Sequence, residues 1–169
     1  MAGGAGRMTK VFVVETSYLC ELYRVPNFSD PKFFASLRTR WNGEREAGAS
    51  FRVPVGCVYQ LCDHIADVPD GGKRRKLAVQ VATDVRSSVE NWMPWLIIPS
   101  DGVTELARFV HRFASDDGHR ELGLTNSQIV EIATGLKRKY GGVGSYQVHI
   151  WTRNETLKAY EPDPEPSPL

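Results

Sequence analysis

Four short runs of mainly β-branched, aromatic and other apolar residues divide the 169-residue chain, and the segments between them have helical character. The runs cover residues 10–14, 51–55, 95–99 and 146–151. Residues 11–14 are all apolar, a composition typical of a strand buried on both faces. Strands that alternate with helices favour a parallel sheet. The sequence therefore predicts one three-layer α/β domain, with a central parallel sheet of four to five strands and helices on both faces.

The segments between the runs carry helix start and stop signals. Thr16 can cap one helix, and Asp30 followed by Pro31 predicts the start of a second. Further helices are predicted over residues 59–66, 73–93, 104–113, 125–136 and 154–160, with loops at 115–118 and 140–144. The helix that starts at Pro31 is expected to bury Phe33, Phe34, Leu37 and Trp41. The long helix over residues 73–93 is expected to bury Leu77, Val81, Val85, Val89 and Trp92.

Composition is typical of a globular protein. The formal net charge is +1, which excludes a polybasic, histone-like protein but permits a local patch that binds nucleic acid. The three cysteines, Cys20, Cys57 and Cys62, form no C-x-x-C pair, and we expect buried thiols in the reducing cytoplasm. The apolar runs are too short to span a membrane. The expected organisation is a flexible N-terminus over residues 1–9, a domain over 10–160 and a disordered proline-rich, acidic tail over 161–169.

Polar side chains lie where the predicted strands end, and parallel sheets bind ligands at this carboxyl edge. Glu15 follows the first strand, Gln60 and Asp63 follow the second, Asn126 lies near the start of a helix, and Asn154 follows the last strand. Gln60 and Asp63 lie about one helical turn apart and share a face. A carboxylate at the end of a buried strand needs a polar cleft or a partner, so Glu15 is the strongest candidate for a site.

Four stretches resemble the motifs of the PIN-domain family, in the family's order and over nearly the whole chain. They are residues 11–19 (VFVVETSYL), 53–61 (VPVGCVYQL), 123–133 (GLTNSQIVEIA) and 148–157 (VHIWTRNETL). The resemblance implies a small α/β domain that cuts RNA with Mg²⁺ or Mn²⁺ held by acidic residues. It also implies that RNA is a partner. Further expectations are a toxin–antitoxin role, an antitoxin or other protein partner, and a homodimer.

The chain departs from the family pattern at the acidic positions. The family expects Asp, Glu, Asp and Asp, whereas this chain has Glu15, Gln60, Asn126 and Asn154. Amides keep much of the shape of the acids but lose their charge, and Mg²⁺ prefers charged oxygen ligands. The expected metal ligands are Glu15 and Asp63, with Asn126 and Asn154 as neutral ligands. The resemblance adds Thr16, Gln60 and Thr152 to the expected catalytic residues.

Two hypotheses of different classes follow. The first is a metal-dependent ribonuclease with weakened catalysis. The second is a degenerate PIN-like domain that binds RNA or a protein partner without cleaving. The chemistry of the amides favours the second, and the resemblance favours the first. A third hypothesis is that the amides replace the acids of an active enzyme.

Purely structural roles are open for several of these residues. Thr125 and Gln128 have the spacing of a capping box, Thr152 or Asn154 can cap the last helix, and Gln60 with Asp63 can form an ordinary polar helix face. Basic residues, one group of them near Trp41, suit a phosphate backbone with stacked bases, although solvated helix surfaces have the same composition. The expected RNA-binding residues are Arg38, Arg40, Lys73, Arg74, Arg75, Lys137 and Arg138.

Overall fold

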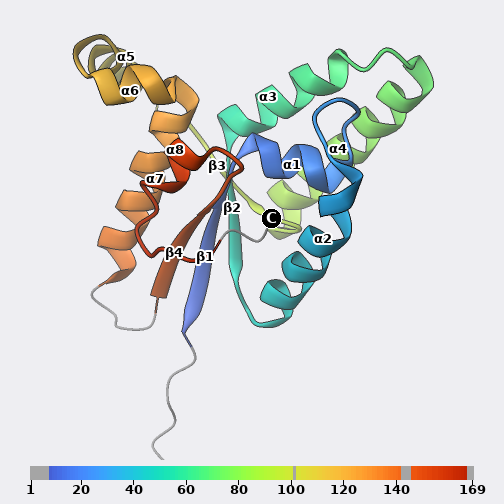
Figure 1. The fold of residues 1–169 in the computed structure, drawn as a ribbon, viewed down its shortest axis with the longest axis horizontal. Helices are drawn as coiled ribbons and strands as arrows, with labels where there is room; N and C mark the ends of the chain where they lie inside the picture. Colours follow the sequence, from blue (N-terminus) through green and yellow to red (C-terminus); the bar gives the residue numbers. More distant parts are fainter. Residues whose placement is uncertain (1–7, 101, 142–145, 167–169) are drawn as a thin grey trace, which may run out of the picture.

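A four-stranded, fully parallel sheet forms the centre of the molecule (Figure 1). The computed structural model describes residues 8–100, 102–141 and 146–166. The strands are β1 (Thr9–Val14), β2 (Ser50–Pro54), β3 (Leu96–Ile98) and β4 (Tyr146–Trp151), in the order β3-β2-β1-β4. β1 lies inside the sheet, and Val11 to Val14 are at most 1% exposed. The predicted parallel α/β sheet is confirmed.

Helices cover both faces of the sheet, which confirms the predicted three layers. Figure 1 shows α1 to α4 on one side, and α7 against β4 and β1 on the other. The helices are α1 (Thr16–Tyr23), α2 (Pro31–Glu46), α3 (Val55–Ala66), α4 (Gly71–Asn91), α5 (Val103–Ser115), α6 (Asp117–Leu122), α7 (Leu124–Tyr140) and α8 (Glu155–Lys158).

Aromatic rings fill the layer between the sheet and α2. Trp41 stacks on Phe51 with ring centroids 3.8 Å apart, and Phe12 lies 4.4 Å from Trp151 and 5.3 Å from His149. Such rings bury large apolar areas and also gain from offset and edge contacts. The β1, β2 and β4 segments thus share one core with the second helix.

Several predictions of burial and boundaries are wrong. Val89 and Trp92 are 69% and 72% exposed, because the buried face of α4 passes through Val81 and Ser88, each 3% exposed, and Trp92 follows the end of the helix. Cys62 is exposed, whereas Cys20 and Cys57 are buried. The predicted loop at 115–118 instead contains the start of α6, where the Asp116 carboxylate accepts a hydrogen bond from the His119 N–H. Residues 142–144 of the predicted glycine-rich turn lie outside the described residues.

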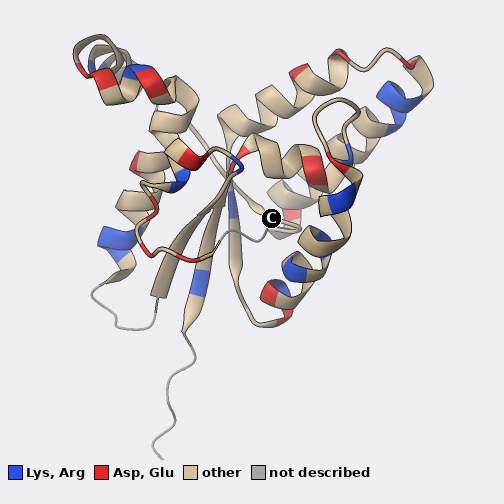
Figure 2. Ribbon diagram, viewed as in Figure 1, with Lys and Arg blue, Asp and Glu red and all other residues tan. Residues whose placement is uncertain are grey.

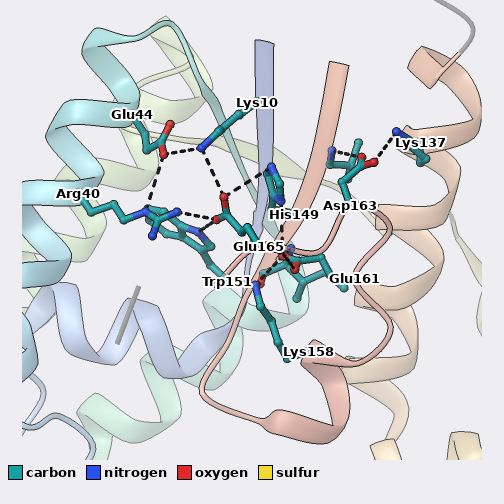
Figure 3. Close-up of polar contacts among 12 residues, drawn as sticks. Lys10, Arg40, Glu44, Lys137, His149, Trp151, Lys158, Glu161, Asp163 and Glu165 are labelled. Atoms are coloured by element: carbon teal, nitrogen blue, oxygen red, sulfur yellow. Dashed lines mark hydrogen bonds and ion pairs between the residues drawn. The ribbon is translucent and has the colours of Figure 1, made fainter. Parts of the chain in front are cut away.

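The C-terminal segment, residues 161–166, lies along the outer edge of β4 (Figure 3). The Glu161 and Asp163 carboxylates each accept a backbone N–H, from Ile150 and Val148 respectively, at 2.7 Å. β4 is an edge strand, so these N–H groups face away from β1, and buried edge donors need partners. The prediction of a disordered tail is therefore wrong for residues 161–166. Residues 167–169 lie outside the described part, as do residues 1–7 of the predicted flexible N-terminus, whereas Thr9 begins β1.

Basic side chains fix the same acidic segment from three elements (Figure 3). Lys137 of α7 lies 2.6 Å from Asp163, Lys158 lies 2.6 Å from Glu161, and Arg40 of α2 lies 2.9 Å from Glu165. Glu161 and Asp163 therefore act both as edge caps and as ion-pair partners, and Glu165 acts as an ion-pair partner.

His149 is buried between two of these carboxylates, at 1% exposure. Its ring nitrogens each lie 3.7 Å from a carboxylate oxygen, one of Glu161 and one of Glu165, and make no hydrogen bond within the described part of the chain. Burial lowers the pKa of His149, and the opposing charges of Glu165 and Glu161 do not overcome this effect. The folded protein therefore favours the neutral imidazole.

We predict that acid destabilises the fold through His149. In the unfolded chain His149 is protonated with a pKa near 6.5, whereas in the folded chain its pKa is lower. Protonation therefore favours the unfolded chain, and stability is lost as the pH falls through 6.5. The free energy of unfolding should therefore decrease from pH 6.5 to pH 5.5 through this residue. Urea unfolding at the two pH values measures the effect, and His149→Phe should reduce it. An unchanged pH dependence in that variant would contradict the prediction.

Candidate functional site

A pocket of about 330 Å³ lies at the carboxyl edge of the sheet, between α1, α3 and the start of α7. It brings together five residues that the sequence selected, which are Glu15, Thr16, Gln60, Asp63 and Asn126. The other residues that line the pocket are Ser17, Cys20, Phe28 and His64. We call this cavity the edge pocket.

Glu15 links the ends of β1 and β4. Its N–H donates to the Trp151 carbonyl at 2.9 Å, which continues the pairing of the two strands by one residue. Its Oε2 accepts hydrogen bonds from the Ser17 N–H at 3.0 Å, the Ser17 hydroxyl at 2.5 Å and the Thr152 hydroxyl at 3.1 Å. This carboxylate therefore caps α1 and holds the start of the segment after β4.

Gln60 connects three helices at the wall of the pocket. The Thr16 hydroxyl of α1 donates to its Oε1 at 2.6 Å, and its Nε2 donates to the Thr125 hydroxyl of α7 at 3.3 Å. One amide can accept and donate at the same time, whereas an ionised glutamate could only accept. The amide at position 60 thus fits its surroundings in the folded chain.

Asn154 lies outside the edge pocket and caps a helix. Its Oδ1 accepts from the Leu157 N–H at 3.1 Å at the start of α8, and its own N–H donates to the Thr152 hydroxyl at 3.0 Å. This position supports the capping role rather than the predicted role as a metal ligand. Thr152 is buried and acts on the pocket through its hydrogen bond to Glu15.

The capping box predicted at Thr125 and Gln128 is not formed. Helix α7 begins at Leu124, and the residue before it, Gly123, has a φ of +78° and no side chain to act as a cap. Glycine adopts this left-handed backbone region without strain. Thr125 is therefore available to accept the hydrogen bond from Gln60.

The side chains of the edge pocket do not fit a two-metal centre. Within the described residues, no group of three or more His, Cys, Asp or Glu side chains is placed to hold a metal ion. Glu15 and Asp63 are the acidic residues among those lining the pocket. Some of the oxygens that could bind a metal ion are already in use, because Oε2 of Glu15 accepts three hydrogen bonds and Oε1 of Gln60 accepts one. Mg²⁺ and Mn²⁺ favour several hard oxygen ligands with carboxylate charge.

The predicted RNA-binding residues lie in separate places (Figure 2). Lys73, Arg74 and Arg75 occupy the first turns of α4, and Lys137 and Arg138 lie near the end of α7, on opposite sides of the view. Lys137 and Arg40 form ion pairs with the C-terminal segment, and Arg74 donates to the Val68 carbonyl. Arg38 lines a different pocket. These basic residues do not surround the edge pocket.

An aromatic wall of the pocket was not predicted from the sequence. Phe28, in the loop after α1, stacks on His64 of α3 with ring centroids 3.9 Å apart and an interplanar angle of 24°. No sequence pattern links two residues so far apart in the chain. Ser17 was also missed, although its position directly after a predicted cap gave a signal for a hydrogen bond to Glu15.

Comparison with models of protein families, with curated proteins and with solved structures gives no match for this chain. Among the described residues, no helix is both long and apolar enough to cross a membrane.

We predict that Thr152→Val destabilises the protein. The substitution keeps the shape of the side chain but removes one of three hydrogen bonds to a buried carboxylate and the acceptor of the Asn154 N–H. Together these losses should cost about 1–3 kcal/mol of unfolding free energy. Urea unfolding measures the loss. Thr156→Val, at an exposed site on α8, is the matched control and should change stability by less than about 0.5 kcal/mol. Equal effects of the two substitutions would contradict this role of Thr152.

Proposed function

We propose that the chain is a PIN-like domain that binds single-stranded RNA by taking an unpaired base into the edge pocket, without metal-dependent cleavage. The observation that carries the proposal is the donor set of this pocket, in which amides and hydroxyls accompany two carboxylates. Such a set suits hydrogen bonding to the edge of a base better than the binding of two metal ions.

The free polar groups of the pocket support recognition of a base. Within the described residues, the side chains of Asn126 and Asp63 make no hydrogen bond, and Oε1 of Glu15 is likewise unused. An amide can both donate to and accept from a base edge, whereas carboxylates accept from exocyclic amino groups. The stacked Phe28 and His64 rings offer an aromatic wall to the same cavity. Proteins that read single-stranded RNA combine stacking on aromatic rings with hydrogen bonds to base edges.

The ribonuclease hypothesis rests on the resemblance and is tested by the same measurements. Two carboxylates in one pocket, Glu15 and Asp63, are the observation in its favour. A toxin role, an antitoxin or a second copy as partner, and a cytoplasmic location stay predictions.

We predict that the protein binds a 12-nucleotide single-stranded RNA and that Asn126→Ala weakens binding about tenfold, through the loss of base hydrogen bonds. Fluorescence anisotropy in EDTA and in Mg²⁺ measures the affinity, which should be the same in both. Asn91→Ala, at an exposed site at the end of α4, is the matched control and should bind like the natural sequence.

Incubation of the same RNA with Mg²⁺ or Mn²⁺ separates the two hypotheses. We expect intact RNA. Cleavage that depends on the metal and disappears in Glu15→Gln would show that the domain is a nuclease. Equal binding by the Asn126→Ala variant and the natural sequence would place the RNA outside the edge pocket.

A preference for bases with amino groups is also expected. Oε1 of Glu15 and the Asp63 carboxylate can only accept hydrogen bonds, so adenine and cytosine should bind better than uracil. Oligo(A) and oligo(C) 12-mers should bind several-fold more tightly than oligo(U) in the same anisotropy assay. A preference for oligo(U) would contradict this orientation of the base.

A further inference from the structure

A second pocket, of about 220 Å³, lies between α2 and α4, away from the edge pocket. Helix α2 contributes Arg38, Asn42 and Arg45, which are spaced so that they share one helical face. Helix α4 contributes Gln80 and Asp84 from the opposite side. We call this cavity the arginine pocket.

The two guanidinium groups of the arginine pocket have no acidic partner. Within the described part of the chain, neither Arg38 nor Arg45 forms an ion pair, and the Arg38 guanidinium lies 5.8 Å from the centroid of the Phe34 ring. By contrast, Arg40 on the same helix pairs with Glu165 at 2.9 Å. The amides of Asn42 and Gln80 are also without hydrogen bonds among the described residues. The pocket thus brings together solvent-exposed donors from two helices that have no partner among the described residues.

Asp84 is the acid among the residues that line the arginine pocket, and one of its oxygens already accepts a hydrogen bond. The Tyr23 hydroxyl donates to Oδ2 of Asp84 at 2.6 Å. Two arginines against one aspartate leave the pocket with an excess positive charge. Tyr23 and Trp95, which meet edge to face at 5.8 Å, add aromatic surface to the lining.

This chemistry selects the class of ligand. A carboxylate has two oxygens and is satisfied by one guanidinium fork, whereas a phosphomonoester has three terminal oxygens and close to two negative charges. Two arginine side chains and two amides offer more donors than one carboxylate can accept, and the aromatic lining suits an attached ring. We propose that the arginine pocket binds the phosphate group of a small aromatic phosphomonoester. This inference does not rest on the proposed binding of RNA.

Calorimetry with phenyl phosphate, at fixed ionic strength, tests the proposal. We expect saturable binding, and a loss of at least tenfold in affinity for Arg38→Gln and for Arg45→Gln, since each removes a charged hydrogen-bond donor. Arg86→Gln, at an exposed site of α4 that does not line the pocket, removes the same charge and should leave the affinity unchanged. Benzoate, the matched carboxylate, should bind at least tenfold more weakly.

A variant that should bind more tightly is a useful control, because a variant that fails to fold would lose affinity. Asp84→Asn keeps an oxygen that can accept from Tyr23 but removes the negative charge, so phenyl phosphate should bind several-fold more tightly. The proposal would be overturned by any one of four results: no saturable binding, equal binding of benzoate, an equal loss in Arg86→Gln, or weaker binding by Asp84→Asn. Asn126→Ala should leave phenyl phosphate binding unchanged, which separates this site from the edge pocket.

Discussion

The parallel pairing of β1 with β4 is the constraint on which the rest of the structure depends. The strands pair from Thr9 with Tyr146 to Val14 with Trp151, and the Glu15 N–H extends the ladder to the Trp151 carbonyl. Parallel strands end at the same edge, so Glu15 and Thr152 meet although 137 positions separate them. The Glu15 carboxylate then fixes the start of α1, and α1 presents Thr16 to Gln60. A buried hydrogen-bond network of this kind holds the edge pocket in one shape.

Much of the fold could be predicted because its strands have a strong local signal. The apolar run from Val11 to Val14 is almost fully buried, and the alternation of strands and helices restricts the connections to a parallel sheet. The position of the C-terminal segment could not be predicted, since its composition is typical of disorder. Its acids accept hydrogen bonds from N–H groups of β4 and form ion pairs with Lys137 and Arg40, which are far away in the chain, and neither feature is visible in local sequence. The exposure of Val89 could not be predicted either, because its polar neighbour Ser88 takes the buried position on α4.

The candidate site could be predicted in its location but not in its chemistry. The rule that ligands bind at the carboxyl edge, together with the PIN-like motifs, selected Glu15, Gln60 and Asn126, and all three line one pocket. The hydrogen bonds on Oε2 of Glu15 and the chain from Thr16 through Gln60 to Thr125 depend on side-chain geometry that only the fold provides. In this setting the amide of Gln60 has partners on both sides. The amide of Gln60 therefore has a structural role of its own, beyond the loss of an acidic side chain from the site.

The central claim is that the edge pocket accepts a base and does not hold a metal ion. Side-chain amide signals of Gln60 and Asn126, recorded by ¹⁵N NMR, report on both events in one sample. We predict that single-stranded RNA shifts the Asn126 side-chain signal, and that stoichiometric Mn²⁺, a paramagnetic ion, broadens neither amide more than exposed amides such as that of Asn91. Selective broadening of both pocket amides by Mn²⁺, with no shift of Asn126 on addition of RNA, would contradict the claim.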